Sequence, residues 1–193
     1  MSTEIENLLR IMPAEFGLDE CVAWARVNRV WGTAFPSDYV EFMAVYGRGS
    51  INNSVHILRA PTVDQAEFER QAEETSRNVA ELNEYLDSDY AGYPTPGGLI
   101  LWGTDYCGSD AYWKTGAANP DEWPVILYDR GENEWVEYPP GMADLLVAQI
   151  TRGIDDRPFS MMDRIEGRPP RFINSRVEET INTSAESWSD LAD

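Results

Sequence analysis

The side chains best suited to covalent chemistry are one histidine, His56, and two cysteines, Cys21 and Cys107. A pair of Cys107 and His56 has the residue types of a nucleophile and its base. Such a pair also needs an orienting group and an oxyanion site, and no motif supplies either. The sequence has no glycine-rich phosphate loop, no dinucleotide-binding fingerprint and no zinc-binding spacing of Cys and His. We therefore expect a protein without enzymatic activity and without a cofactor.

Carboxylates are abundant but are not spaced like a metal site. Asp105, Asp110, Asp121 and Glu122 offer the oxygen ligands that hard cations prefer, yet their spacing fits no calcium loop. Paired carboxylates for acid–base catalysis are compatible with a chain of 34 acidic residues, but no pair stands out. We expect no bound metal.

The charge balance restricts the kind of partner. Against 34 acidic residues stand 15 Lys and Arg, giving a net charge of −19. This field repels nucleic acid and anionic lipid and favours a basic protein partner, although an acidic surface also serves solubility alone. No apolar run approaches the length of a membrane span. The partner we expect is a protein, not nucleic acid or a membrane.

The opening "MSTEIENLLR" is acidic and lacks the apolar core of a secretory signal. We therefore expect a cytoplasmic protein in which Cys21 and Cys107 are reduced thiols.

The first third of the chain is patterned for helices. "TEIENLLRIM" predicts a short helix, and "LDECVAWARVNRVW" predicts a second with Asp19 and Glu20 in its first turn. In "FPSDYVEFMAVYGRGS" a proline suited to a helix start precedes apolar residues at steps of three and four, and two glycines follow. "SINNSVHILRA" predicts one strand, and about 63–87 predicts a long acidic helix with one apolar face.

The second half predicts an antiparallel meander. Four aromatic or β-branched runs, "GLILWGTD", "DAYWKT", "EWPVILYDR" and "NEWVEYP", are separated by turn residues. "PPGMADLLVAQI" predicts a helix. Beyond Gly153 the pattern is irregular, with "SAESWSDLAD" as a possible terminal helix. Clustered strands favour an α+β fold, with a domain over 1–152 and a C-terminal extension over 153–193.

Two blocks of this pattern resemble the SUKH superfamily. "FPSDYVEFMAVYGRG" resembles its signature helix that ends in Tyr-Gly-x-Gly. "GLILWGTDYCGSDAYWKTG" and "EWPVILYDR" resemble its following strands, the first with a Trp-Gly pair. The resemblance covers roughly 18–150 and implies an antiparallel or mixed sheet packed against several helices. It implies that the framework is formed by Pro36, Tyr39, Phe42, Tyr46, Gly47, Gly49, Trp102, Gly103, Trp113 and Trp123.

The resemblance also implies a binding protein. Bacterial members of the superfamily are largely immunity proteins that neutralise a co-encoded toxin, and fungal relatives regulate cell-wall assembly. We expect an immunity protein that covers a basic toxin domain, with an intracellular regulator or scaffold as the alternative.

The meander's turns and polar face carry the predicted contact. Aromatic and acidic residues suit a basic partner, and Tyr is enriched at binding hot spots. The predicted contact residues are Asp105, Tyr106, Asp110, Tyr112, Glu132 and Glu134. The acidic helix is the second candidate surface.

Overall fold

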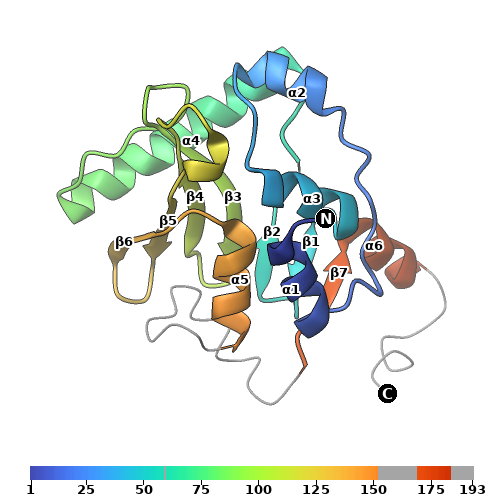
Figure 1. Cartoon of the computed structure of the whole chain (residues 1–193). Helices are drawn as coiled ribbons and strands as arrows, with labels where there is room; N and C mark the ends of the chain where they lie inside the picture. The colour runs from blue at the N-terminus through green and yellow to red at the C-terminus, as the bar shows by residue number, and fades with distance from the viewer. Residues whose placement is uncertain (59, 152–168, 184–193) are drawn as a thin grey trace.

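The computed structural model describes residues 1–58, 60–151 and 169–183. Within these ranges seven strands form one antiparallel sheet in the order β6-β5-β4-β3-β2-β1-β7 (Figure 1). The strands are β1 Gly49–Ile51, β2 Val55–Ile57, β3 Leu99–Asp105, β4 Asp110–Lys114, β5 Val125–Asp129, β6 Glu134–Tyr138 and β7 Phe172–Asn174. The helices are α1 Thr3–Ile11, α2 Trp24–Trp31, α3 Ser37–Val45, α4 Gln65–Leu86, α5 Met142–Thr151 and α6 Ser175–Thr183, with a short 3₁₀ turn at Pro120–Glu122. The predicted α+β class is confirmed.

The main hydrophobic core lies between the sheet and helices α1, α3 and α5, which lie in front of the strands in Figure 1. Tyr39 of α3 packs edge-on against Trp113 of β4, and Trp113 lies beside Trp102 of β3. Trp123 is buried in the same core. Trp102, Trp113 and Trp123 therefore fill the space between the sheet and these helices, as aromatic side chains of high buried area do.

The signature helix α3 forms as its sequence predicts. Pro36 precedes it, and its apolar positions Tyr39, Phe42 and Met43 are buried. Gly47 takes a φ of +70°, the left-handed conformation that favours glycine after a helix.

The opposite face of the sheet carries α4 and a second, smaller core. Val79 of α4 clusters with Leu99, Tyr112 and Ile126 from three adjacent strands. The acidic helix therefore has the apolar face that the sequence predicts. It anchors α4 to the middle of the sheet, and the charged faces of α4 are left to solvent.

The helix predicted over "LDECVAWARVNRVW" begins later than expected, at Trp24. The Leu18 N–H donates to the Tyr46 carbonyl oxygen (3.2 Å) and the Glu20 N–H donates to the Met43 carbonyl oxygen (3.1 Å). Because these backbone groups pair with the end of α3, residues 18–23 run alongside α3. Asp19 and Glu20 are therefore not in the first turn of a helix.

The single strand predicted over "SINNSVHILRA" is a hairpin of β1 and β2. The reversal occurs at Asn52 and Asn53, which both have positive φ values of 49° and 55°. Asparagine tolerates this conformation better than most residues, which makes it a common turn residue.

Part of the predicted irregular C-terminal extension belongs to the sheet. Phe172–Asn174 forms β7, which pairs with β1, and α6 follows directly. The predicted boundary at residue 152 therefore does not coincide with the edge of the sheet. "SAESWSDLAD" lies outside the described residues.

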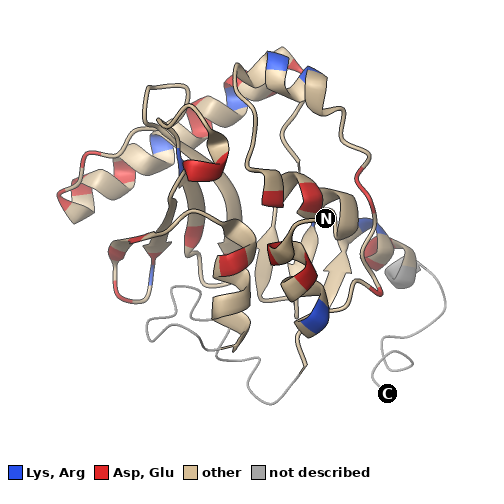
Figure 2. Cartoon of the chain, in the orientation of Figure 1, with Lys and Arg blue, Asp and Glu red and all other residues tan. Residues whose placement is uncertain are grey.

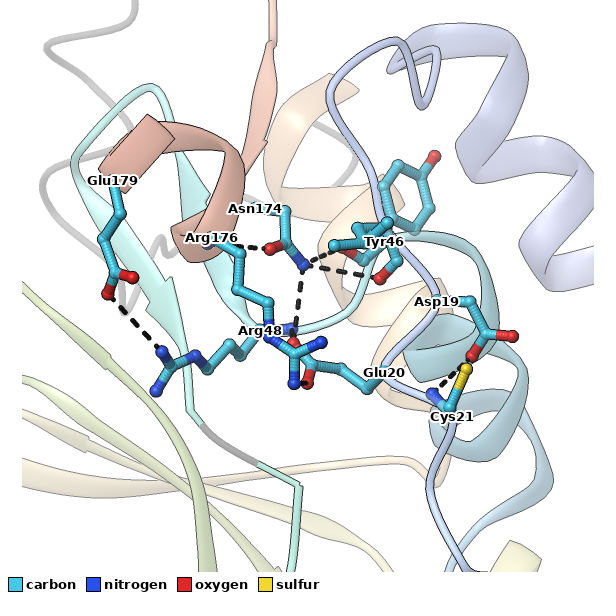
Figure 3. Close-up of polar contacts among 9 residues, drawn as sticks. Asp19, Glu20, Cys21, Tyr46, Arg48, Asn174, Arg176 and Glu179 are labelled. Atoms are coloured by element: carbon cyan, nitrogen blue, oxygen red, sulfur yellow. Dashed lines mark hydrogen bonds and ion pairs between the residues drawn. The ribbon is translucent and has the colours of Figure 1, made fainter. Parts of the chain in front are cut away.

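The Asn174 side chain lies at the centre of the contacts that hold β7 and α6 in place (Figure 3). Its Nδ2 donates to the Tyr46 carbonyl oxygen (3.0 Å), and its Oδ1 accepts from the Arg176 N–H (2.9 Å). The Arg176 guanidinium pairs with the mostly buried Glu20 carboxylate at 3.0 Å. We call these four residues the Asn174 cluster.

Candidate partner-binding surface

Two of the six predicted contact residues are buried. Asp105 is 4% exposed, and its Oδ1 accepts the backbone N–H groups of Cys107 (2.8 Å) and Ser109 (2.9 Å). Tyr112 is 1% exposed and donates its hydroxyl to Asp110 Oδ2 at 3.1 Å. Neither side chain is available to a partner. Asp105 shapes the β3–β4 turn, and Tyr112 belongs to the second core.

Of the other four predicted residues, three are exposed at the turn end of the sheet and Asp110 is half-buried. Tyr106 is 74% exposed in the β3–β4 turn, and Glu132 and Glu134 are exposed in and after the β5–β6 turn. Asp110 is half-buried on the sheet face that carries α4. Between the two turns lies the side chain of Arg130, which packs against Gly108. The turn end of the sheet is therefore mixed in charge and is not uniformly acidic.

Asp110 lies in a polar row that crosses the sheet. Its cross-strand neighbours are Thr104 on β3 and Tyr128 on β5. Burial raises the pKa of the Asp110 carboxyl, while hydrogen bonds from Thr104 and Tyr112 act in the opposite direction. The nearby Asp105 carboxylate adds to the rise. The Asp110 carboxyl thus has a structural role, because it accepts hydrogen bonds from neighbouring side chains on the same face of the sheet.

A surface with a more uniformly negative charge lies where the end of α4 meets β6. Segment 78–91 contains four acidic residues and segment 131–139 contains three, and neither segment contains Lys or Arg. We call these seven residues the acidic edge, and all of them are exposed. They are Glu81, Glu84, Asp87, Asp89, Glu132, Glu134 and Glu137. Figure 2 shows acidic positions at the projecting C-terminal end of α4 and along the β5–β6 hairpin.

Tyr90 joins the two parts of the acidic edge. Its ring lies 5.1 Å from the Trp135 ring of β6, and its carbonyl oxygen accepts from Asn83 Nδ2 of α4 at 2.6 Å. The Lys114 ammonium lies 5.5 Å from the Tyr90 ring and 3.4 Å from the Glu137 carboxylate. These contacts fix the end of α4 beside β6.

Trp135 supports the acidic edge by packing against three tyrosines. Besides Tyr90 it contacts Tyr112 (5.8 Å between ring centroids) and Tyr128 (5.5 Å). Aromatic contacts at these separations add to the stability that burial provides. The acidic side chains therefore project from a well-packed base, which reduces the ordering cost when a partner binds.

Tyr85 is the residue of this surface that sequence reasoning missed. It is 80% exposed, the highest value among the large hydrophobic side chains of the described residues. Glu81 precedes it by four residues, so the two side chains lie on the same face of α4. The signal was present in the sequence, because Tyr85 falls outside the apolar face that contains Val79, Leu82 and Leu86. A large exposed aromatic among carboxylates is a natural anchor for a partner.

A pocket of about 300 Å³ lies between α4 and the sheet. Its walls include Trp31, Leu58 and Leu101, and polar side chains such as Gln71 and Asn78 also line it. The pocket is mainly apolar, and its charged lining residues, Arg70 and Glu74, form an ion pair at 3.3 Å.

A second pocket of about 220 Å³ is acidic and includes Asp38. The two carboxylate oxygens of Asp38 accept the backbone N–H groups of Tyr39 (2.7 Å) and Ala143 (2.9 Å). Asp38 therefore serves to position the starts of α3 and α5.

The groups singled out for covalent chemistry are not assembled into a site. His56 lies in β2 between Ser50 and Thr104, and Cys107 is exposed in the β3–β4 turn. In the described ranges no hydrogen bond joins them, and no group of three or more His, Cys, Asp or Glu is placed to hold a metal ion. The polar side chains of the Asn174 cluster are occupied by contacts with one another.

The sheet covered by helices on both faces and the signature helix α3 define a SUKH-type domain. The family model described as SMI1-KNR4 cell-wall matches residues 23–146, and the chain belongs to this SUKH family. Neither the search of curated proteins nor the search of solved structures found a significant match. Among the helices of the described residues, none has the length and apolarity required to cross a bilayer.

Proposed function

We propose that the protein is a non-enzymatic immunity protein that binds a co-encoded toxin in the cytoplasm and blocks it. The observation that carries the proposal is the acidic edge with its exposed Tyr85. A rigid surface of seven carboxylates suits the basic cleft of an enzyme that handles phosphates. The protein acts by covering that cleft and needs no chemistry of its own.

Two features support the choice of the acidic edge over the β3–β4 turn. Tyr85 has Glu81 and Glu84 as neighbours, whereas Tyr106 belongs to a turn that packs against Arg130. A basic partner meets two carboxylates beside Tyr85, whereas beside the Tyr106 turn it meets the positive charge of Arg130.

The alternative function is that of an intracellular regulator or scaffold without a toxin partner. The description of the matching family, which refers to the cell wall, favours it. A regulator and an immunity protein can use the same acidic surface, so the nature of the partner decides between them.

The test is protection. The toxin domain encoded beside this gene is expressed in a host cell with and without the protein, and its activity is also assayed with purified components. We expect the host to survive only with the protein present, and a stoichiometric amount to inhibit the purified toxin domain. Cell death despite soluble protein, or the absence of a toxin gene beside this one, would favour the regulatory alternative.

A matched pair of variants locates the effect. Glu81→Lys with Glu84→Lys, and Glu73→Lys with Glu74→Lys, change the net charge by the same amount on the same helix. We expect the first pair to abolish protection and the second to retain it. Equal behaviour of the two pairs would mean that only the overall charge matters.

A further inference from the structure

The backbone of β6 presents unpaired groups along its outer edge. The Lys114 N–H donates to the Pro124 carbonyl oxygen at 3.0 Å, so the backbone of residue 124 points toward β4. Successive residues of a strand direct their backbone groups to opposite sides. The backbone N–H and C=O groups of Val125 therefore point toward β6, where the residue paired with Val125 is Tyr138.

The same alternation settles the orientation of β6. Val136 and Tyr138 direct their backbone groups to β5, so Trp135 and Glu137 direct theirs away from the sheet. In the described part of the chain no strand lies beyond β6. Two residues thus offer a donor and an acceptor each to an added strand.

The other edge of the sheet is covered. Ile173 of β7 forms a parallel bridge with Phe16, and the Asn174 N–H donates to the Phe16 carbonyl oxygen at 2.9 Å. Only the β6 edge is left open among the described residues. Natural proteins usually protect such an edge against unwanted pairing.

The charges on β6 restrict what can pair with it. Glu134 and Glu137 are both exposed, and the rest of the acidic edge lies nearby through Tyr90. A second copy of this chain would bring the same carboxylates against each other, which is unfavourable. A strand with basic side chains meets mainly complementary charge, because Glu134, Glu137 and Asp89 are exposed beside the cation Lys114, which pairs with Glu137.

We propose that β6 receives an extended, basic segment of a protein partner as an added strand. The proposal rests on the proposed function, because it specifies how the partner contacts the acidic edge. Backbone hydrogen bonds to Trp135 and Glu137 align the segment, and its basic side chains face Glu137 and Asp89. Strand addition of this kind takes affinity from the backbone and specificity from the side chains.

The experiment uses the full chain and a short synthetic peptide of alternating Lys and Val with blocked ends. Glu137→Pro removes one outward N–H without disturbing a hydrogen bond to β5, since proline is tolerated on that side of an edge strand. Glu137→Ala is the matched control, because it removes the same carboxylate and keeps the N–H. Binding is followed by fluorescence anisotropy at low salt, with an acidic Glu/Val peptide as the charge control.

We expect Glu137→Pro to weaken peptide binding by about tenfold or more relative to Glu137→Ala, and the acidic peptide not to bind. Amide exchange in the parent protein provides a readout that does not depend on how the variants fold. Peptide binding should slow exchange at Trp135 and Glu137. Equal affinity of the two variants, protection confined to other segments, or no binding of the basic peptide would overturn the inference. None of these outcomes depends on a toxin, so the proposed function is tested separately.

Discussion

At the scale of single residues, Tyr46 connects three separate parts of the chain. Its ring lies 4.8 Å from the Phe42 ring and 5.2 Å from the Phe172 ring. Its hydroxyl donates to the Met12 carbonyl oxygen at 2.5 Å. The last aromatic residue of the signature helix therefore holds the end of α1 and strand β7 in place.

Replacing Tyr46 tests this framework role. Tyr46→Ala should lower the free energy of unfolding by about 3–5 kcal/mol, as truncation of a buried aromatic does. Tyr46→Phe should cost about 1–3 kcal/mol, because it keeps the ring and leaves the Met12 carbonyl oxygen without this donor. Urea unfolding measures both. A melting temperature of Tyr46→Ala within a degree of the parent would contradict the assignment.

Asp110 supplies a pH-dependent prediction. Burial raises the pKa of this carboxyl above its ordinary value of 3.8, so the folded state holds the proton more tightly than the unfolded state. The stability that Asp110 contributes is therefore greatest at low pH and falls as pH rises through the interval between the two pKa values. Asp110→Asn should raise the melting temperature at neutral pH, and the gain should shrink below a pH of about 4. Thermal unfolding across pH measures it. A constant difference at all pH values would exclude this linkage.

The residue scale also shows where sequence reasoning reaches its limit. The burial of Trp102 and Trp113 agrees with the framework role that the family resemblance implies. The sequence could not show that Asp105 turns inward to its own turn, because that depends on a local hydrogen-bonded geometry. Tyr112 alternates with neighbours that face the main core, so its burial required the knowledge that α4 covers the other face.

At the scale of elements, the fold depends on the pairing of β7 with β1. These strands lie so close that a Cβ added at Gly49 would be 2.1 Å from the Ile173 carbonyl oxygen. The second glycine of the signature therefore permits close approach of a strand that lies outside the family match, which ends at residue 146. The family resemblance places Gly49 in the framework but does not indicate this contact.

Gly49→Ala should consequently loosen the C-terminal elements. We expect a loss of about 1–3 kcal/mol, since an extra methyl in a filled space forces the backbone apart. Gly131→Ala is the control, because its added Cβ would meet only Asp129 Oδ1 at 3.2 Å in an exposed turn. Hydrogen exchange should quicken across 169–183 in Gly49→Ala and stay unchanged in Gly131→Ala. Unchanged exchange in both would mean that β7 does not depend on Gly49.

The elements that sequence reasoning predicted well have a strong periodic signal. The signature helix, the acidic helix and the four-stranded meander fall in this group. The β1–β2 hairpin was missed because Asn52 and Asn53 were not recognised as turn residues. The start of α2 was placed too early because tertiary hydrogen bonds to α3 hold residues 18–23 in a non-helical path.

At the scale of the whole molecule, the net charge of −19 acts beyond any single contact. Its field attracts a basic partner over distances comparable to the Debye length, about 8 Å in physiological salt. Such steering raises the association rate more than it lengthens the life of the complex. The lifetime instead depends on a few desolvated anchors.

Charge reversal at Glu73 and Glu74 separates these two effects. The pair lies on α4, away from the acidic edge, so its replacement by Lys should slow association and reduce the salt dependence of the association rate. Dissociation should remain nearly unchanged. The measurement is surface plasmon resonance against the proposed toxin partner at two salt concentrations. A large change in dissociation would place the contact on this part of α4 instead.

The central claim is that the acidic edge, and not the β3–β4 turn, holds the proposed partner, and one comparison tests it most directly. Dissociation of the complex with the proposed toxin partner is measured for Tyr85→Ala and Tyr106→Ala, which truncate tyrosines that are 80% and 74% exposed. The account predicts that Tyr85→Ala speeds dissociation by about tenfold or more, about 1.4 kcal/mol, while Tyr106→Ala leaves it nearly unchanged. Faster dissociation of Tyr106→Ala with no change for Tyr85→Ala would contradict the account and would place the contact at the β3–β4 turn.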